Sequence, residues 1–110
     1  MTKKTQREKR RYILFELVCE ETFKREEIVT GIWNSCLEFL GELGASRTSL
    51  WVHEYENKEG IVSCNTRSVD EIIMCLSLVQ EIEKREAHIQ VKGVSGTIKG
   101  LRRCYNGFCR

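Results

Sequence analysis

Proline is missing from the whole chain of 110 residues. A proline-rich linker and a polyproline ligand are therefore excluded. The chain also has no Cys-x-x-Cys pair, because its six cysteines are scattered, and His53 and His88 each stand alone. Zinc ligands normally come in close pairs, so this spacing disfavours a metal site. Dispersed, reduced cysteines are typical of an intracellular compartment, and we expect a cytoplasmic protein.

Long apolar runs are missing too. Residues 72–79 contain Ser77 and are far shorter than the roughly 18 residues that a membrane-spanning helix needs. The basic start of the chain leads into apolar residues 12–15, but Glu16 interrupts them and no small-x-small cleavage site follows. We therefore expect a soluble protein that is neither exported nor bound to a membrane.

The sequence offers no recognisable catalytic constellation. Neither histidine belongs to a motif that would link it to a nucleophile, and the glutamates are scattered over the predicted helix faces. A metal-dependent nuclease needs carboxylates that converge on one point, and nothing in the spacing requires that here. We expect no catalytic residue and no metal ligand in this chain.

Charge is distributed unevenly. Residues 1–11 carry six Lys or Arg and one Glu, residues 92–110 carry five and no acid, and residues 12–91 carry seven against fifteen acidic residues. Two basic segments on an acidic body predict binding to a polyanion, although solvated termini would have the same composition. We divide the chain into a basic arm over 1–11, a domain over 12–94 and a basic tail over 95–110.

The first half of the chain predicts a strand, a helix and a hairpin. Residues 12–19 are almost continuously apolar or β-branched, as in a central strand. Residues 24–43 repeat apolar side chains every fourth position, which indicates an amphipathic helix, and Gly44 is a candidate left-handed stop. Residues 47–56 and 60–66 are rich in strand formers and flank a turn.

The second half predicts another helix and strand. Ser68 and Glu71 have the spacing of a capping box, and helical periodicity continues to about Lys84. Residues 88–94 alternate as in a strand, and a short helical turn follows. The order strand, helix, strand, strand, helix, strand predicts an α+β ferredoxin-like fold. It has a four-stranded antiparallel sheet with two helices on one face, so the other face is left open.

Several stretches together carry a family resemblance. The most specific is Gly-Val-Ser-Gly-Thr-Ile-Lys at residues 93–99, followed by Leu101 and a basic residue. The others are Lys-Arg-Arg-Tyr at 9–12, Phe23-Lys24, Glu27-Ile28, Ile32-Trp33, Leu-Gly-Glu-Leu-Gly at 40–44, and Gly60-Ile61-Val62 with Cys64. In this order they resemble archaeal ribonuclease P protein component 2 over nearly the whole chain. The sequence departs from that family at Ser63, where an arginine is usual.

The resemblance implies a protein subunit of the ribonucleoprotein that removes the 5′ leader from precursor tRNA. In that endoribonuclease the RNA carries the hydrolysis, with Mg²⁺ expected at the RNA and no cofactor bound by the protein. The implied partners are the catalytic domain of ribonuclease P RNA and protein component 3. The resemblance also implies a second copy of this chain within a heterotetramer. Precursor tRNA is then a partner through the whole complex.

RNA contacts are expected from both basic segments. Cations of the arm would neutralise phosphates, and the glycines at 93 and 96 would allow close approach to hydroxyls and N–H groups of the same loop. A capped turn needed only for folding would have the same sequence. The predicted RNA-binding residues are Lys9, Arg10, Arg11, Arg67, Ser95, Thr97, Lys99, Arg102 and Arg103.

Other functions of this fold were weighed. A ferredoxin-like small-molecule sensor usually has a glycine-bearing loop after the first strand, and an acylphosphatase-type enzyme has a Gly/Arg phosphate loop there; residues 20–24 contain neither. Another kind of RNA-binding module would place aromatic side chains on the open face. Tyr12, Phe15, Trp51 and Tyr55 are candidates, but such residues are more often core or protein-contact residues.

Overall fold

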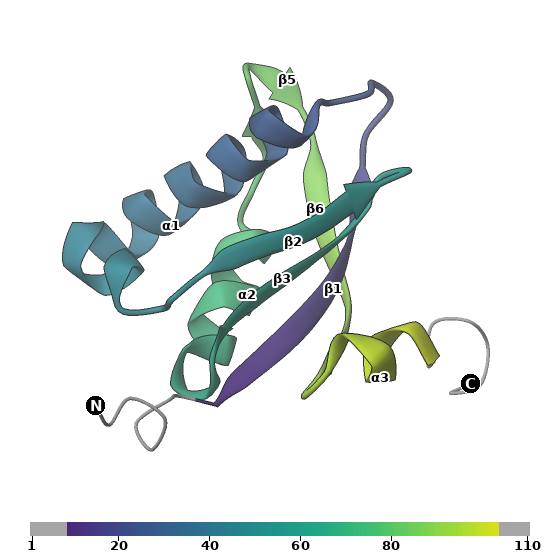
Figure 1. Cartoon of the computed structure of the whole chain (residues 1–110). Helices are drawn as coiled ribbons and strands as arrows, with labels where there is room; N and C mark the ends of the chain where they lie inside the picture. Colours follow the sequence, from purple (N-terminus) through teal and green to yellow (C-terminus); the bar gives the residue numbers. More distant parts are fainter. Residues whose placement is uncertain (1–8, 104–110) are drawn as a thin grey trace.

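The computed structural model describes residues 9–103 (Figure 1), and the side chains of Arg102 and Arg103 lie outside that description. The predicted arm and tail are therefore described only in part. The elements in chain order are β1 (Arg10–Val18), α1 (Arg25–Ser46), β2 (Trp51–Glu56), β3 (Glu59–Asn65), the 3₁₀ turn η2 (Thr66–Ser68), α2 (Val69–Ser77), β4 (Glu81–Ile82), β5 (Arg85–Glu86), β6 (His88–Ser95) and α3 (Ile98–Arg103).

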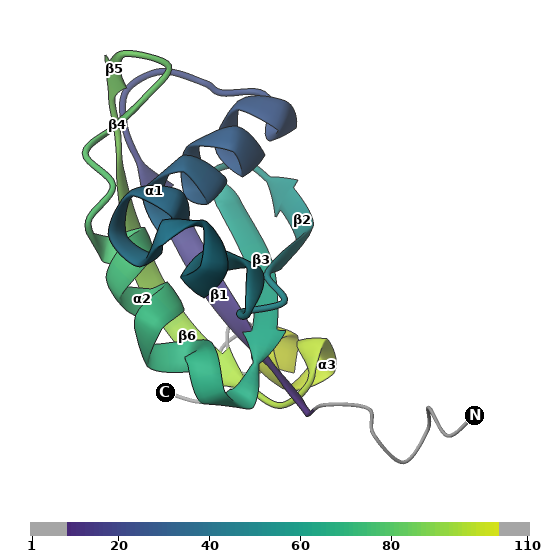
Figure 2. The ribbon, with the colours of Figure 1, turned by 90° about the vertical axis from the view of Figure 1, so that its left-hand side faces the viewer.

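The main sheet has the strand order β2-β3-β1-β6, and β1 pairs antiparallel with both β3 and β6. Helices α1 and α2 cover one face, while α3 lies on the other (Figure 2). The predicted ferredoxin-like fold is confirmed. A separate two-stranded hairpin, β4–β5, extends the layer of α1 and α2. In the described part of the chain, no helix combines the length and apolar character that crossing a membrane requires.

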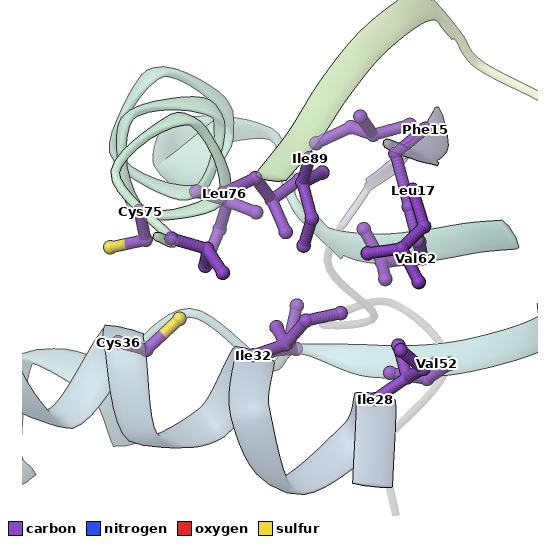
Figure 3. Packing of buried hydrophobic residues seen from close by; sticks show 14 of the residues in the cluster. Phe15, Leu17, Ile28, Ile32, Cys36, Val52, Val62, Cys75, Leu76 and Ile89 are labelled. Atoms are coloured by element: carbon purple, nitrogen blue, oxygen red, sulfur yellow. The ribbon is translucent and has the colours of Figure 1, made fainter. Parts of the chain in front are cut away.

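The main core lies between the sheet and the two long helices. Alternate residues of β1 point into it, namely Ile13, Phe15 and Leu17, and all three are essentially inaccessible to solvent. From the helix side, Ile32 points toward the sheet between Val62 and Ile89 (Figure 3). The four-residue period of α1 is the pattern that the sequence predicted, and the almost continuous apolar run of β1 fits its place as a central strand.

The face opposite α1 and α2 is only partly open. Leu101 of α3 packs against Leu14 and Ile61, with Tyr12 and Ile98 beside them, and forms a small second core. Because β1 is apolar on both faces at Leu14 and Phe15, it reads as a continuous apolar run in the sequence. The short helical turn predicted after residue 94 is therefore a structural cover for the sheet.

Three local predictions were wrong. Gly44 does not end α1: the helix continues to Ser46, and the residue with left-handed φ is Gly41, at +77°, where the helix kinks. Ser68 makes no side-chain capping bond to α2, because η2 leads directly into that helix. A capping carboxylate is found instead at the start of α1, where Glu27 Oε1 accepts the N–H of Lys24 at 2.8 Å.

Helix α2 ends at Ser77, well before the predicted Lys84. Glu83 and Lys84 both have φ near +60°, so they form the two-residue turn of the β4–β5 hairpin. Val79 and Ile82 continue the apolar spacing of α2. The chain at these two residues is extended, yet both side chains are buried. Ile82 packs against Gly31 of α1, where a β-carbon would come within 3.0 Å of its side chain.

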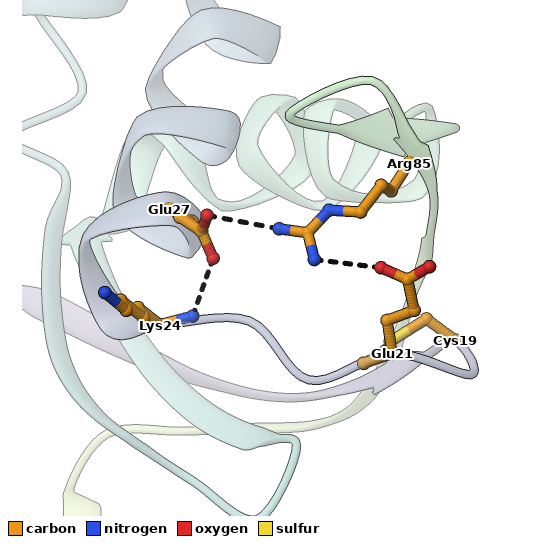
Figure 4. A network of polar contacts seen from close by, with 5 residues as sticks. All are labelled: Cys19, Glu21, Lys24, Glu27 and Arg85. Atoms are coloured by element: carbon orange, nitrogen blue, oxygen red, sulfur yellow. Dashed lines mark hydrogen bonds and ion pairs between the residues drawn. The ribbon is translucent and has the colours of Figure 1, made fainter.

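An ion-pair network fastens this hairpin to the loop between β1 and α1 (Figure 4). Arg85 Nη1 lies 2.9 Å from Glu21 Oε1, and Nη2 lies 3.1 Å from Glu27 Oε2. The same guanidinium stacks 4.2 Å above the ring of buried Phe23. The loop in which a sensor or an acylphosphatase would hold its ligand is thus engaged with Arg85.

Gly60 is required by packing. A β-carbon there would overlap the ring of Phe15 and lie 2.9 Å from the carbonyl oxygen of Glu54. We predict that Gly60→Ala lowers the free energy of unfolding by about 1–3 kcal/mol through overpacking, measured as the urea midpoint. The control is Gly93→Ala, whose new methyl group would make an ordinary 3.6 Å contact with Leu101. An equal loss in both variants would contradict the packing argument.

Candidate nucleic-acid interface

Most of the predicted RNA-binding residues converge on one end of the sheet, at the bottom of Figure 1. In an antiparallel sheet, the start of β1 lies beside the ends of β3 and β6, as the pairs Arg10–Asn65 and Tyr12–Ser95 record. The turn after β3 is fastened there, because the N–H and Oγ1 of Thr66 both donate to the carbonyl of Lys9 at 3.1 Å. Arg67 follows and is exposed.

The loop between β6 and α3 brings Ser95, Thr97 and Lys99 to the same end. Ser95 Oγ accepts the N–H of Thr97 at 3.2 Å, and Thr97 Oγ1 accepts the N–H of Gly100 at 2.9 Å. Both hydroxyls therefore shape the entry into α3, and each keeps its own proton for donation. Arg11 lies beside this loop, with Nη1 about 3.6 Å from where a β-carbon on Gly96 would stand.

Arg10 is held flat on the open face. Its Nε and Nη2 donate to Ser63 Oγ at 3.2 and 2.6 Å, and Nη2 also donates to the carbonyl of Ser49 at 2.6 Å. Ser63 is completely buried under this guanidinium. Ser63 Oγ also lies 2.7 Å from Nε2 of His53.

These contacts favour one tautomer of His53. Nε and Nη2 of Arg10 both donate to Ser63 Oγ and occupy its two lone pairs, which leaves the hydroxyl proton for His53 Nε2. His53 is then neutral, with its proton on Nδ1. Burial lowers the pKa of His53, and the positive charges of Arg10 and Arg25 lower it further against the opposing effect of Glu54.

Aromatic side chains accompany this cluster. The strand pairing aligns Trp51, Ser63, Tyr12 and Ser95 in one row across all four strands. The rings of Tyr12 and His53 are tilted against each other with centroids 5.3 Å apart, and Trp51 is 64% exposed. Phe15 and Tyr55 belong to the helix-facing side, where their rings stack on each other.

Several residues of this surface were missed by the sequence analysis. Nothing in the sequence joins Ser63 to His53, because their contact depends on the register of the β2–β3 hairpin and on a bulge after Val52. Arg47 is exposed and belongs to the same end, since Asn65 Nδ2 donates to its carbonyl at 2.6 Å. Arg47 directly follows a long predicted helix, and this position could have indicated that it lies at an end of the domain.

The described residues contain no group of three or more His, Cys, Asp or Glu side chains arranged to hold a metal ion. Cys36, Cys64 and Cys75 are buried free thiols, and burial raises the pKa of Cys36 to about 12 and that of Cys64 to about 11. Thiols that stay protonated at neutral pH are poor nucleophiles and poor metal ligands. What the end of the sheet offers is cations, hydroxyls and aromatic rings.

The sequence profile of the Rpp14/Pop5 family matches residues 11–106. The chain belongs to this family. Curated relatives named ribonuclease P protein component 2 include those of Pyrococcus furiosus, 43% identical over 90% of this chain and 84% of the relative, and Thermococcus gammatolerans, 41% identical over the same shares. That of Methanocaldococcus jannaschii is 37% identical over 86% of this chain and 71% of its own length. The expected ribonuclease P protein subunit is thereby confirmed.

A solved structure has the same fold. A chain in the cryo-EM structure of yeast Ribonuclease MRP superposes with a TM-score of 0.71 and covers 94% of this chain and 96% of its own length. Sequence identity is only 8%, so this likeness concerns the fold alone.

The His53 contacts predict a pH effect on stability. Because the pKa of His53 is lower in the folded protein than the roughly 6.5 of an unfolded chain, the unfolded chain binds more protons as the pH falls below about 7. The free energy of unfolding should therefore decrease between pH 7 and pH 5.5 by more in the parent protein than in His53→Gln. Urea midpoints at both pH values measure this. Equal pH dependence in the two proteins would contradict it.

Proposed function

We propose that this ribonuclease P protein subunit binds the catalytic RNA through the end of the sheet, here called the basic end. It consists of Lys9, Arg10, Arg11, Arg47, Arg67, Lys99 and the α3 residues Arg102 and Arg103. The observation that carries the proposal is convergence: four separate segments (the start of β1, the residue after α1, η2 and α3) meet at this end, while the intervening chain is acidic. Phosphate groups are the natural counterpart of such a surface.

The local charges support phosphate binding rather than internal pairing. Among the described side chains, no ion pair joins Lys9, Arg10, Arg11, Arg47, Arg67 or Lys99 to a carboxylate. Asp70 and Glu71, which follow Arg67, lie in the first turn of α2, where they interact favourably with the helix dipole. Cations without carboxylate partners remain available to an RNA backbone.

In this proposal the hydrolysis of precursor tRNA is performed by the RNA with Mg²⁺, and the protein neutralises phosphates that would otherwise repel one another. Neutralising these phosphates stabilises the compact RNA and lowers the Mg²⁺ concentration that the RNA requires. We place the complex in the cytoplasm, because the four described cysteines are free thiols, as a reducing compartment favours.

The proposed protein partner, ribonuclease P protein component 3, would bind on the opposite layer. Exposed apolar side chains lie on α1 and directly after α2, and Phe39 and Leu78 line one hollow of about 380 Å³ between them. Exposed aromatic and aliphatic residues of this kind are typical of protein interfaces. Pairing of two such heterodimers into a heterotetramer remains part of the proposal.

The functional experiment is precursor-tRNA cleavage by an archaeal ribonuclease P RNA at moderate Mg²⁺, with and without this protein and component 3. Stimulation of cleavage is expected only when both proteins are present. A folded protein that gives no stimulation in the presence of component 3 would overturn the proposal.

Charge removal should weaken RNA binding in a salt-dependent manner. Each of Lys99→Gln and Arg67→Gln should lower the slope of log affinity against log salt by about 0.7–0.9. The measurement is a binding titration with ribonuclease P RNA at several salt concentrations. Lys84→Gln is the matched control, since Lys84 is exposed in the β4–β5 turn at the other end of the molecule. A control variant with the same slope change would contradict a specific basic end.

The helical layer gives a separate prediction. Phe39→Ser should weaken binding of component 3 by about tenfold or more, since aromatic residues dominate protein interfaces. Val18→Ser is the control, because Val18 is 49% exposed but lies on β1, away from α1 and α2. Isothermal titration would measure both affinities. An unchanged affinity of the Phe39 variant would place the interface elsewhere.

A further inference from the structure

The most exposed aromatic residue of the sheet is Trp51, and α3 leaves it uncovered. It begins the edge strand β2, whereas α3 packs over Leu14 and Ile61 of β1 and β3. A shallow hollow of about 370 Å³ lies against it, lined also by Arg10, Ser49, Leu50 and His53. This volume falls within the range of small-molecule binding pockets.

Two hydrogen-bond donors, Arg10 and His53, line the hollow together with Trp51. Arg10 uses Nε and Nη2 for Ser63 and Ser49, and its Nη1 has no partner among the described residues. The Nδ1–H of His53 is the second donor, because Nε2 is occupied by Ser63. Both donors are held by a completely buried serine, so they keep their positions before any ligand arrives.

We propose that this hollow binds one unpaired nucleobase, which stacks on Trp51 while Arg10 and His53 donate hydrogen bonds to its acceptor edge. The inference rests on the proposed RNA contact at the basic end and extends it from phosphates to a base. Arg47 is exposed two residues before Ser49, where it would meet the phosphate of the same nucleotide.

Chemistry favours a single-stranded nucleotide over a duplex or an acidic peptide. A base within an RNA helix is stacked and cannot present its ring face to an indole. A base that is splayed out offers both a ring face and acceptor atoms, and every base has a ring face, so stacking tolerates sequence changes. The charge of Arg10 and of the adjoining basic end then holds the phosphates.

Fluorescence can follow the site directly. The chain has two tryptophans, so Trp33→Phe makes Trp51 the single indole reporter. We would titrate the full chain with a single-stranded adenosine RNA hexamer and with a blunt RNA duplex. Quenching of Trp51 by the hexamer, and much weaker quenching by the duplex, is expected. Trp51→Ala should bind the hexamer about 5- to 150-fold more weakly, and Trp51→Phe should retain most of the affinity.

Failure of this inference is distinguishable from failure of the basic end. Unchanged Trp51 emission, or a Trp51→Ala variant that binds the hexamer as tightly as the parent, would overturn the stacking site. If Lys99→Gln still weakens RNA binding in that case, the basic end stands without a base pocket. A Trp51→Ala variant that loses component 3 and keeps the hexamer would assign the hollow to a protein contact and overturn the inference.

Discussion

The rest of the structure depends on the antiparallel pairing of β1 with both β3 and β6. Because β1 is central, its residues must be apolar toward α1 and α2 at Ile13, Phe15 and Leu17, and apolar again under α3 at Leu14. The same pairing brings the start of β1 beside the ends of β3 and β6. Three segments that are far apart in the sequence therefore share one end of the sheet, and the cations at their ends gather there.

Much of the fold could be predicted because it follows from local periodicity. The continuous apolar run of β1 indicates a central strand, the four-residue repeat of α1 states which of its faces is buried, and the order of the elements then selects the topology. The end of α2 could not be predicted in this way. Val79 and Ile82 are buried at helical spacing, yet the chain there is extended, and the turn at Glu83 and Lys84 lacks the glycine that usually marks such a turn.

The candidate site was predictable in composition but not in geometry. Runs of cations and the Gly-Val-Ser-Gly-Thr segment at residues 93–97 are visible in the sequence, and they do lie together. The contact of Arg10 with Ser63 and His53 depends on a strand register and a bulge, which no local pattern encodes. The guanidinium of Arg10 lies over Ser63 from the neighbouring strand, so a positive charge stands at this position of the sheet.

The acidic charge of residues 12–91 and the cations at one end of the sheet give the protein an electrostatic polarity. Residues 12–91 carry fifteen acidic residues against seven basic ones, so most of the surface repels an RNA backbone. A polyanion that approaches meets an excess of positive charge at the end where Lys9, Arg67 and Lys99 lie. A uniformly basic domain would bind RNA in many orientations, whereas this charge separation favours one. A phosphate contact fixes orientation without reading sequence, so any recognition of individual nucleotides must come from the open face beside the basic end, where Trp51 and Arg10 lie.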